Sequence, residues 1–476
     1  MIAAKFVSMR QRCIGLLLTA IACAMAGCVS TSLPDLSVPL TPQWRNVDTS
    51  SGNGLADMAA TRWWSVFADP ALDALIQQAL SANLDIAEAG MRLRAARTLN
   101  AHAGGPLRPS LAFATSNPVD PDASASFLLA GFDAIWEFDL FGRGTALHRV
   151  ARGDLARAQA DVSEAHLTVV AEVARNWIEL RSAQAQEAEL ARIGELRYRQ
   201  SALIDEELRL RLVAPQVALR ARAVAASADA AISEPHAAAV AAAQALAALL
   251  GRAEPDRSWL HSPSQSRTVD LSSLPLPAPP ADLLRTRPDI ARSEAAVVHA
   301  AGELGLANAD RYPRVAIGGS IVFSTSEIED RPTTPSSISS FGPIIDIPLF
   351  DWGLRRAKAD ARGALLQAAA IHYRKTVLDA VAEVETALST TASQRRRVQS
   401  DSSELQALDA VSARTAERHR LGLASGLDVV GDRIEREQAA VALAESQLKL
   451  ALDYIALQKA LGNADVPSSP AVARVR

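Results

Sequence analysis

The sequence predicts a mainly helical fold with a small β part, built from two copies of one structural unit. Leu84-Asp85-Ile86 is answered 204 residues later by Pro288-Asp289-Ile290. Two long stretches contain no proline, from Thr145 to Ala214 and from Gly353 to Asp465. A duplication of this length indicates two similar units related by pseudo-symmetry. The proline-free stretches indicate helices far longer than those of a globular domain, as in a coiled coil.

Further pairs of segments support the duplication. Asp139-Leu140-Phe141-Gly142 is answered by Pro348-Leu349-Phe350-Asp351 at a spacing of 209 residues. The two copies close with Leu250-Gly251 and Leu461-Gly462, which are 211 residues apart. We therefore expect a first repeat over residues 63–255, a linker over 256–280, a second repeat over 281–462 and a C-terminal tail over 463–476.

Residues 1–27 have the features of a signal peptide. Three basic residues precede an apolar run from Ile14 to Ala24, which is too short to span a bilayer. Met25-Ala26-Gly27-Cys28 is similar to a bacterial lipobox. The resemblance implies cleavage before Cys28 and attachment of a diacylglycerol and an N-acyl chain to that residue. A plain signal peptide followed by a chance cysteine is the alternative.

Composition excludes several classes of function. The net charge is −4, and it becomes about −7 once the basic leader is removed. No basic patch stands out, so we expect no nucleic-acid partner. The other cysteines, Cys13 and Cys23, leave with the leader, so a disulfide or a zinc-binding thiolate set is not expected. The eight histidines are scattered, and we find neither a metal site nor a catalytic set, so we predict a non-enzyme without a cofactor other than the lipid.

The first repeat begins after an N-terminal arm over residues 28–62. From Trp63 to Arg97 the apolar residues recur with helical period, and Asp69-Pro70 provides a helix start. Each repeat then contains one hairpin. The strands are expected at about 110–118 and 126–140, and at about 314–324 and 338–350, a length that crosses a membrane as a tilted β-strand. A soluble hairpin is the alternative.

The last helix carries two apolar stripes with a seven-residue period on nearly opposite faces. One stripe starts at Leu427 and the other at Leu443. A helix with two opposite apolar stripes can pack against a neighbouring helix on each side, as in a single layer of helices. A buried helix in a thick bundle is the alternative. Gly422, Ser425 and Gly426 predict a tight reversal between two antiparallel helices. Subtracting 209 places the first-repeat counterpart at Arg211, where this pattern is not recognisable.

Several segments together resemble the TolC-like outer-membrane efflux proteins, in the lipoprotein (NodT-type) branch that serves resistance–nodulation–division pumps. The resemblance covers almost the whole chain and rests on five segments: Trp63–Ile86, Trp136–Arg143, Arg285–Ile290, Gly342–Asp351 and Arg420–Val429. It implies a homotrimer in the outer membrane. The three copies would form a helical α-barrel and a shared 12-stranded β-barrel, which pass small molecules from the periplasm to the exterior.

The same resemblance implies partners and site residues. A periplasmic adaptor, itself joined to an inner-membrane pump, would contact a helical tip formed by Leu421, Gly422, Leu423, Ala424 and Ser425. Asp428 matches an acidic position that constricts the closed entrance in relatives. The alternative role for Asp428 is to cap the helix that follows Gly426. Gly431 stands where relatives carry a second acidic residue, so a second ring of acids is doubtful.

Two other classes of protein stay open at this point. A periplasmic lipoprotein coiled coil without a pore would also need long helices, but it would not need strands of membrane length. A lipoprotein hydrolase would need a catalytic set, which the sequence does not show.

Overall fold

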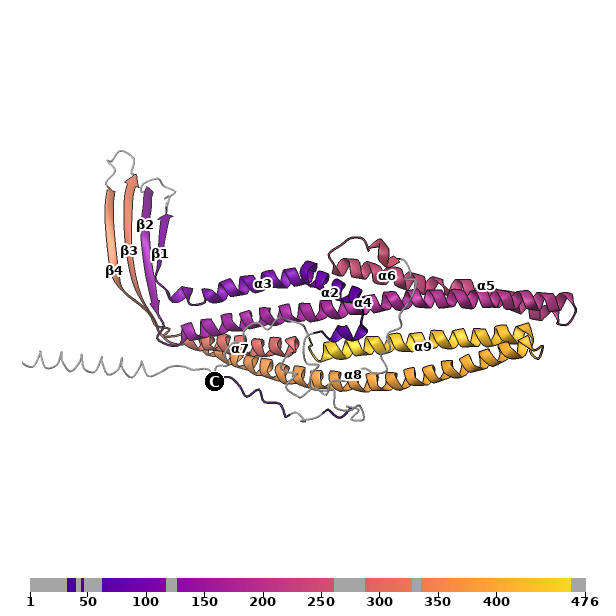
Figure 1. Ribbon diagram of the computed structural model, residues 1–476. Coiled ribbons are helices and arrows are strands. Elements are labelled where there is room, and N and C mark those ends of the chain that lie inside the picture. Colours follow the sequence, from indigo (N-terminus) through magenta and orange to yellow (C-terminus); the bar gives the residue numbers. More distant parts are fainter. Residues whose placement is uncertain are drawn as a thin grey trace, which may run out of the picture. The chain divides into compact units, whose positions relative to one another are not determined.

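The computed structural model describes residues 32–39, 44–46, 62–116, 126–260, 287–327 and 335–463. It shows a mainly helical chain with one four-stranded antiparallel sheet, which confirms the predicted fold class (Figure 1). The chain forms two compact units, and each unit contains residues from both repeats. Cys28, the leader, and most of the predicted linker and tail lie outside the described residues.

The first unit contains Arg92–Gln159 and Ala291–Lys375 and holds the sheet. The strand order is β1-β2-β3-β4, so β2 and β3 join the two repeats, and β1 and β4 form the edges. The strands are β1 (Ser110–Ser116), β2 (Ser126–Phe138), β3 (Arg314–Glu327) and β4 (Pro335–Asp346).

Strand β4 differs from its prediction at both ends. It starts at Pro335 rather than 338. Proline has no N–H to donate to the ladder, but it is tolerated as the first residue of a strand. It ends at Asp346 rather than 350, because Asp346 pairs with Arg314, the first residue of its only neighbour in the described sheet, β3. Strand β3 extends to Glu327, beyond the expected end at 324.

Two helices of the first unit approach each other unusually closely. These are the first part of α4 (Arg143–Arg209) and α7 (Pro288–Ala309). A Cβ atom placed on Gly153 would lie 2.7 Å from the backbone nitrogen of His299. A Cβ atom on Gly302 would lie 2.6 Å from the backbone nitrogen of Val150. Small residues therefore allow the two backbones to meet.

The second unit contains the largest hydrophobic core. Its elements are η1 (Trp63–Phe67), α2 (Pro70–Ala82), α5 (Pro215–Ala231), α6 (Ser233–Leu249), η3 (Arg257–Leu260) and α9 (Gly426–Ala460), with the distal parts of α4 and of α8 (Leu354–Arg420). The core gathers Trp64, Phe67, Trp177 and Tyr454 among aliphatic side chains. Burial raises the pKa of Tyr454 to about 12.

The Trp-rich segment at the start of the first repeat is held by two aspartates. Trp64 Nε1 donates to Asp73 Oδ1 at 2.8 Å, and Trp177 Nε1 donates to Asp69 Oδ2 at 2.7 Å. Asp69 also accepts from the backbone of Ala71, so it caps α2 as predicted. Aspartates therefore start the helix and satisfy the indole nitrogens of Trp64 and Trp177. The buried Nε1 of Trp63 has no partner among the described residues.

The helical segment from Trp63 to Arg97 is not continuous, contrary to its periodicity. It breaks at Asn83, between α2 and α3 (Leu84–Ala101). The Asn83 Oδ1 atom accepts from the backbone of Asp85 and Ile86, which caps α3. Hydrophobic period does not reveal such a break, because a single amide side chain separates one helix from the next.

The long helices agree with the prediction. Helices α4 and α8 have 67 residues each, about 100 Å at 1.5 Å per residue. The reversal before α9 falls at Leu421–Ser425. None of the apolar residues of the two α9 stripes is exposed: Leu427, Ile434, Val441, Leu448, Ile455, Leu443, Leu450 and Leu457. Within the described ranges, every helix lacks the combination of length and apolarity that crossing a bilayer demands.

Candidate functional site: a two-faced sheet and two helical tips

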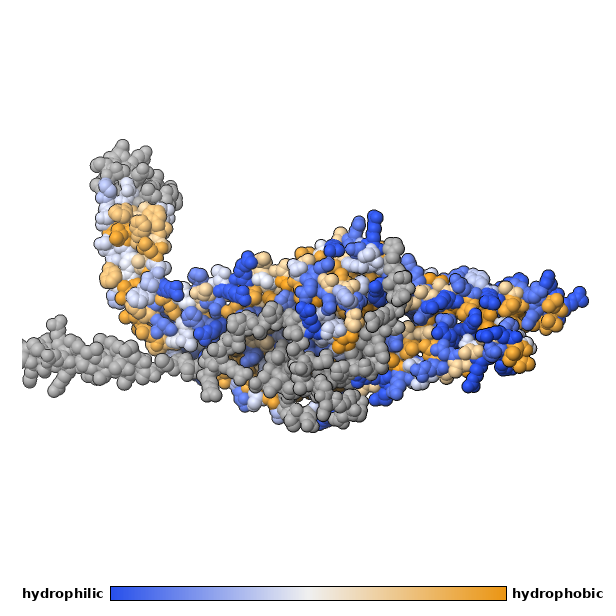
Figure 2. All heavy atoms as spheres, in the orientation of Figure 1, coloured by the Kyte–Doolittle hydropathy of each residue, from blue (hydrophilic) through white to orange (hydrophobic). Residues whose placement is uncertain are grey.

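One face of the sheet is apolar and aromatic. The strand register places Phe113 opposite Phe132, and Trp136 opposite Ile317. The rings of Phe113 and Phe132 lie 5.1 Å apart, and those of Trp136 and Phe138 lie 4.8 Å apart. Where strand side chains are described, no charged residue lies on this face: Leu111, Phe113, Phe132, Trp136, Phe138, Val315, Ile317, Ile321, Phe323, Phe341 and Ile345 are its large members. Figure 2 shows hydrophobic residues gathered over the strands.

The other face of the sheet is polar and contains small residues. Ser320 and Ser340 share a hydrogen bond of 2.8 Å across β3 and β4, and Ser324 and Ser336 share one of 2.6 Å. A sheet with opposite chemistry on its two faces fits a boundary between lipid and water. Leu129, Val322 and three isoleucines also lie here. This face nevertheless carries all the charged side chains described in the strands: Asp133, Glu137, Arg314 and Asp346.

The edges of the sheet continue into helices with exposed apolar residues. Helix α3 leads into β1, and α8 follows β4. In contrast, α7, which leads into the interior strand β3, exposes no large hydrophobic residue. Exposed apolar residues on both of these helices are typical of a surface that contacts another protein or lipid. The exposed residues are Leu84, Met91 and Leu99 on α3, and Leu354, Leu365, Ile371, Leu378 and Val411 on α8.

The second-repeat tip is a tight turn between α8 and α9. Gly422 has a φ of +74°, which favours glycine. The backbone N–H of Gly422 donates to His419 O at 2.9 Å, and that of Leu423 donates to Arg418 O at 2.8 Å. These two bonds form a Schellman motif, which ends the helix. The turn leaves Leu421 and Leu423 exposed, at 66% and 64%.

The first-repeat tip forms the same turn with different residues. Arg211 has a φ of +59°. Its N–H donates to Leu208 O at 2.9 Å, and the N–H of Leu212 donates to Glu207 O at 2.8 Å. Arg211 is therefore the counterpart of Gly422, 211 residues away. The exposed Leu210 and Leu212 match Leu421 and Leu423.

The offset of 209 residues was consequently wrong for the tips. It placed Arg211 opposite Arg420 and hid the shared Arg-Leu-X-Leu sequence, which appears as Arg209–Leu212 and Arg420–Leu423. The spacing of Leu250-Gly251 and Leu461-Gly462 already carried the correct offset. Helices α4 and α8 also start and end 211 residues apart.

Asp428 lies in a capping box at the start of α9. Its backbone N–H donates to Ser425 Oγ at 3.0 Å, and its Oδ2 accepts from the backbone N–H of Ser425 at 2.8 Å. The Ser425 backbone N–H therefore holds the pKa of the exposed Asp428 below its usual value. At the first tip, Ala214 and Val217 stand in these two places, and α5 starts at Pro215 without a side-chain cap.

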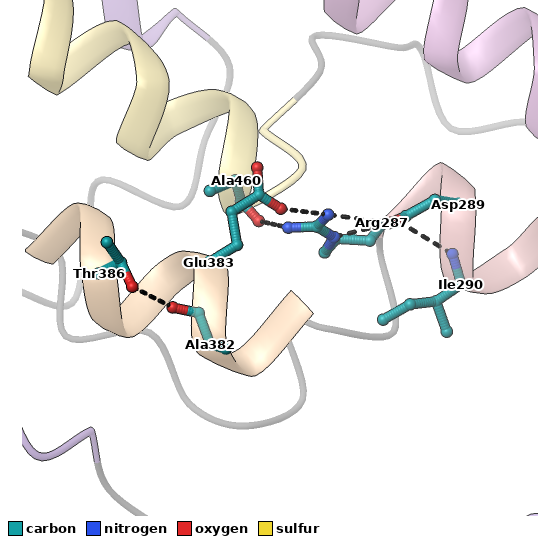
Figure 3. Close-up of polar contacts among 7 residues, drawn as sticks. All are labelled: Arg287, Asp289, Ile290, Ala382, Glu383, Thr386 and Ala460. Carbon is teal, nitrogen blue, oxygen red and sulfur yellow. Dashed lines mark hydrogen bonds and ion pairs between the residues drawn. The ribbon is translucent and has the colours of Figure 1, made fainter. Parts of the chain in front are cut away.

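The start of each repeat is joined to its end by a polar contact. In the second repeat, the buried Arg287 donates to Ala460 O at 2.5 Å, to Glu383 Oε2 at 2.7 Å and to Asp289 Oδ2 at 2.9 Å (Figure 3). Burial alone would raise the pKa of Asp289, but the hydrogen bonds and charge of Arg287 lower it below its usual value. Sequence reasoning noticed Arg287 as part of a motif but missed this contact.

In the first repeat the corresponding contact is neutral. Asn83 Nδ2 donates to Leu249 O at 2.9 Å. Each repeat ends with a glycine of positive φ, Gly251 or Gly462. A Cβ atom on either would lie 3.0 Å from a residue at the start of its own repeat, Ala82 or Arg287.

The chain is similar to known outer-membrane proteins over nearly its whole length. It is 28% identical to "Nodulation protein T" of Rhizobium leguminosarum bv. viciae, over 90% of this chain and 89% of that protein. It is 28% identical to "Pyoverdine export outer membrane protein OpmQ" of Pseudomonas aeruginosa, over 93% of this chain and 95% of that protein. The solved outer-membrane channel OprN has a TM-score of 0.73 at 27% identity, with 91% of this chain and 99% of that chain covered.

The family described as "Outer membrane efflux protein" matches residues 75–252 and 280–463. These two segments correspond to the two repeats, each with one hairpin and one helical tip. Together they cover more than half of the chain, and the expected resemblance is thereby confirmed. The chain belongs to the outer membrane efflux protein family.

Proposed function

We propose that three copies of this chain close into one passive exit duct of a tripartite efflux pump. The observation that carries the proposal is the four-stranded sheet with two open edges and two chemically opposite faces. Open edges are not tolerated in lipid. Three sheets of four strands give a closed barrel of twelve, which is wide enough for a water-filled lumen.

In this arrangement the apolar face meets lipid and the polar face lines the lumen. The serines and glycines of the polar face suit hydrated small molecules rather than one specific ligand. Asp133, Glu137 and Asp346 outnumber Arg314, and would give the lumen an excess of negative charge and hence a preference for cations. A pore-free scaffold would have no use for such a face.

The helices would continue the duct through the periplasm and end at the two tips. The exposed leucines of each tip, with Gly422, Ala424 and Ser425, are the proposed contact for a periplasmic adaptor. The adaptor would join the duct to an inner-membrane pump, and the pump would supply the energy. The duct itself would perform no chemistry and need no cofactor.

Two residues would complete the duct. Three copies of Asp428 around one axis would form a negative ring at the periplasmic entrance, and the lowered pKa keeps this carboxylate ionised at neutral pH. Cys28 would carry a diacylglycerol and an N-acyl chain and so anchor the arm in the outer membrane. Because the barrel holds itself in the lipid, we expect Cys28→Ala to assemble without the anchor.

The test combines assembly with conductance. The full chain is extracted from outer membranes, run unheated on a denaturing gel, and then inserted into planar bilayers. We expect a detergent-resistant trimer that conducts ions with a preference for cations. The Asp133→Asn, Glu137→Gln, Asp346→Asn triple variant should shift the reversal potential in a salt gradient towards zero. A folded monomer, or a trimer without conductance, would support the scaffold instead.

A further inference from the structure

Each repeat has a corner where the chain leaves the sheet and enters a long helix. In the first repeat Phe141 precedes Gly142, whose φ is +76°, and α4 follows. In the second repeat Trp352 precedes Gly353, whose φ is +80°, and α8 follows. The two glycines are 211 residues apart, the same offset as the helix starts and the tips. Phe141 and Trp352 therefore occupy equivalent places, and the spacing of 209 residues that matched Phe141 to Phe350 is wrong here too.

The two aromatic residues have very different surroundings. The Phe141 ring is half-buried and stacks on Tyr312, with 4.9 Å between ring centroids and 13° between planes. Trp352 is 90% exposed, and within the described residues its ring meets only the exposed Phe350. Trp352 also has a φ of +57°, which is strained for a bulky residue. The fold of one chain gives no reason for this residue, which points to a functional contact.

The internal pseudo-symmetry identifies the missing partner. Tyr312 stands before Pro313 at the entry to β3, and the equivalent residue before Pro109 at the entry to β1 is Arg108. Phe141 follows β2, and its partner Tyr312 precedes the neighbouring strand β3. By the same symmetry, the partner of Trp352, which follows β4, should precede β1. Strand β1 is the opposite edge of the sheet, so only another copy can supply it.

We propose that Trp352 of one copy stacks on the guanidinium group of Arg108 in the next copy, a cation–π contact at the seam of the assembly. The inference rests on the proposed trimer and assigns its interface. Arg108 is exposed, and its side chain has no ion-pair partner among the residues that the structure describes. Tryptophan is the best ring for a cation, and guanidinium groups stack on such faces within about 6 Å.

The strand edges agree with this seam. Inside the chain, Trp136 lies opposite Ile317, and Phe138 lies opposite Val315. Strand β4 follows β2 by 211 residues, and β3 follows β1 by 204. These two offsets predict two contacts between copies, Ile347 with Phe113 and Leu349 with Leu111. All four residues are exposed in the single chain, and Leu349 reaches 88%. Apolar side chains would thus cover each other at both edges.

The edge helices agree as well. Where α4 and α7 meet closely inside the chain, α4 contributes Ala146, Val150 and Gly153, and α7 contributes His299 and Gly302. A neighbouring copy could approach α8 as closely as α7 approaches α4. The equivalent residues on the two edge helices are small and exposed: Ala357, Ala361 and Ala364 on α8, and Ala95 and Thr98 on α3.

Cysteine cross-linking tests the contact in outer-membrane vesicles. The Arg108→Cys, Trp352→Cys variant of the full chain is treated with a short bismaleimide. The matched control is Arg108→Cys, Phe141→Cys, because Phe141 has the same backbone position but is covered within its own chain. We expect covalent dimers and trimers for the first variant only, while both variants run as trimers on unheated gels.

The outcomes separate the two proposals. If the Arg108→Cys, Trp352→Cys variant forms trimers without cross-links, and a lipid-soluble maleimide labels its thiol at position 352, then Trp352 faces the bilayer. That result would overturn the contact but not the duct. A wild-type chain that forms no trimer would overturn both.

Trimer stability provides a second measurement. Arg108→Ala and Trp352→Ala should each lower the temperature at which the trimer dissociates, because each removes one partner of the same contact. The double variant should add little to either single variant. Additive effects would contradict the contact, since residues that do not interact lose stability independently.

Discussion

In each repeat a polar contact joins the start of the repeat to its end; we call this contact the joint. The two joints have different chemistry. The first repeat uses Asn83, a neutral amide that donates to Leu249 O at 2.9 Å. The second uses Arg287, which donates to Ala460 O and also pairs with Asp289 and Glu383. The backbone geometry is shared, since Gly251 and Gly462 both have positive φ. The duplication has therefore kept the backbone and allowed the polar partners to diverge.

The two helical tips likewise share a backbone geometry but differ in their side chains. Both are Schellman turns with two exposed leucines, yet Gly422, Ser425 and Asp428 correspond to Arg211, Ala214 and Val217. The second tip starts α9 with a side-chain capping box, whereas the first starts α5 with Pro215 at its first position. Each solution satisfies or removes the free N–H groups at a helix start. A partner that binds both tips meets one fold with two surface chemistries.

The largest effect should come from the joint of the second repeat. Arg287→Ala would leave Ala460 O without its donor and two carboxylates without their cation, a loss of about 3 kcal/mol in local stability. Hydrogen exchange of the last turn of α9 in the purified trimer measures this loss. Arg287→Lys should recover only part of it, because a lysine lacks the forked donors of arginine.

Asn83→Ala is the matched control in the first repeat. It removes one hydrogen bond to Leu249 and the cap of α3. We therefore expect a loss of about 1–2 kcal/mol at the end of α6. Equal losses at the two joints would refute the view that the second repeat relies more on charge.

The next largest effect concerns the stability of the trimer at low pH. The folded pKa of Asp289 is depressed by Arg287, despite burial. Its stabilising contribution is therefore complete above the unfolded value of about 3.9 and is lost as the pH falls through the lower folded value. The trimer should dissociate at lower temperature as the pH drops below about 4. Arg287→Met should flatten this dependence, and Asn83→Ala should leave it unchanged; the opposite ranking would locate the acid sensitivity elsewhere.

The sequence predicted the long helices, the hairpins and the turn before α9, because each of them has a regular local pattern of residues. Prediction failed where the pattern was locally overwritten. Asn83 breaks a periodic helix through one side-chain cap, and Arg211 occupies a turn position that favours glycine. The Arg287 cluster joins residues that are 96 and 173 positions apart, so nothing local reveals it.

A smaller effect separates the two roles of Asp428. Ser425→Ala removes the cap of α9 but keeps the carboxylate, and should cost about 1 kcal/mol at the helix start. If the proposed ring constricts the entrance, Asp428→Asn raises the leak conductance of the trimer in planar bilayers, and Ser425→Ala does not. Equal leak in both variants would assign the change to the lost cap and remove Asp428 from the gate.

The smallest expected change in stability concerns the turn residue at which the two tips differ most. Arg211 carries a left-handed backbone strain that Gly422 avoids. Arg211→Gly should therefore stabilise the first turn by about 0.5 kcal/mol, after the greater freedom of unfolded glycine is subtracted. Hydrogen exchange of the Leu212 amide in the trimer measures this gain.

A charged residue kept under strain at an exposed tip is expected to serve a partner rather than the fold. Arg211→Gly should therefore weaken binding of the adaptor to the purified trimer even though the turn becomes more stable. Gly422→Arg provides the reciprocal change, since it adds strain at the second tip without removing a contact side chain. Unchanged adaptor affinity in Arg211→Gly would show that the first tip tolerates its arginine without using it.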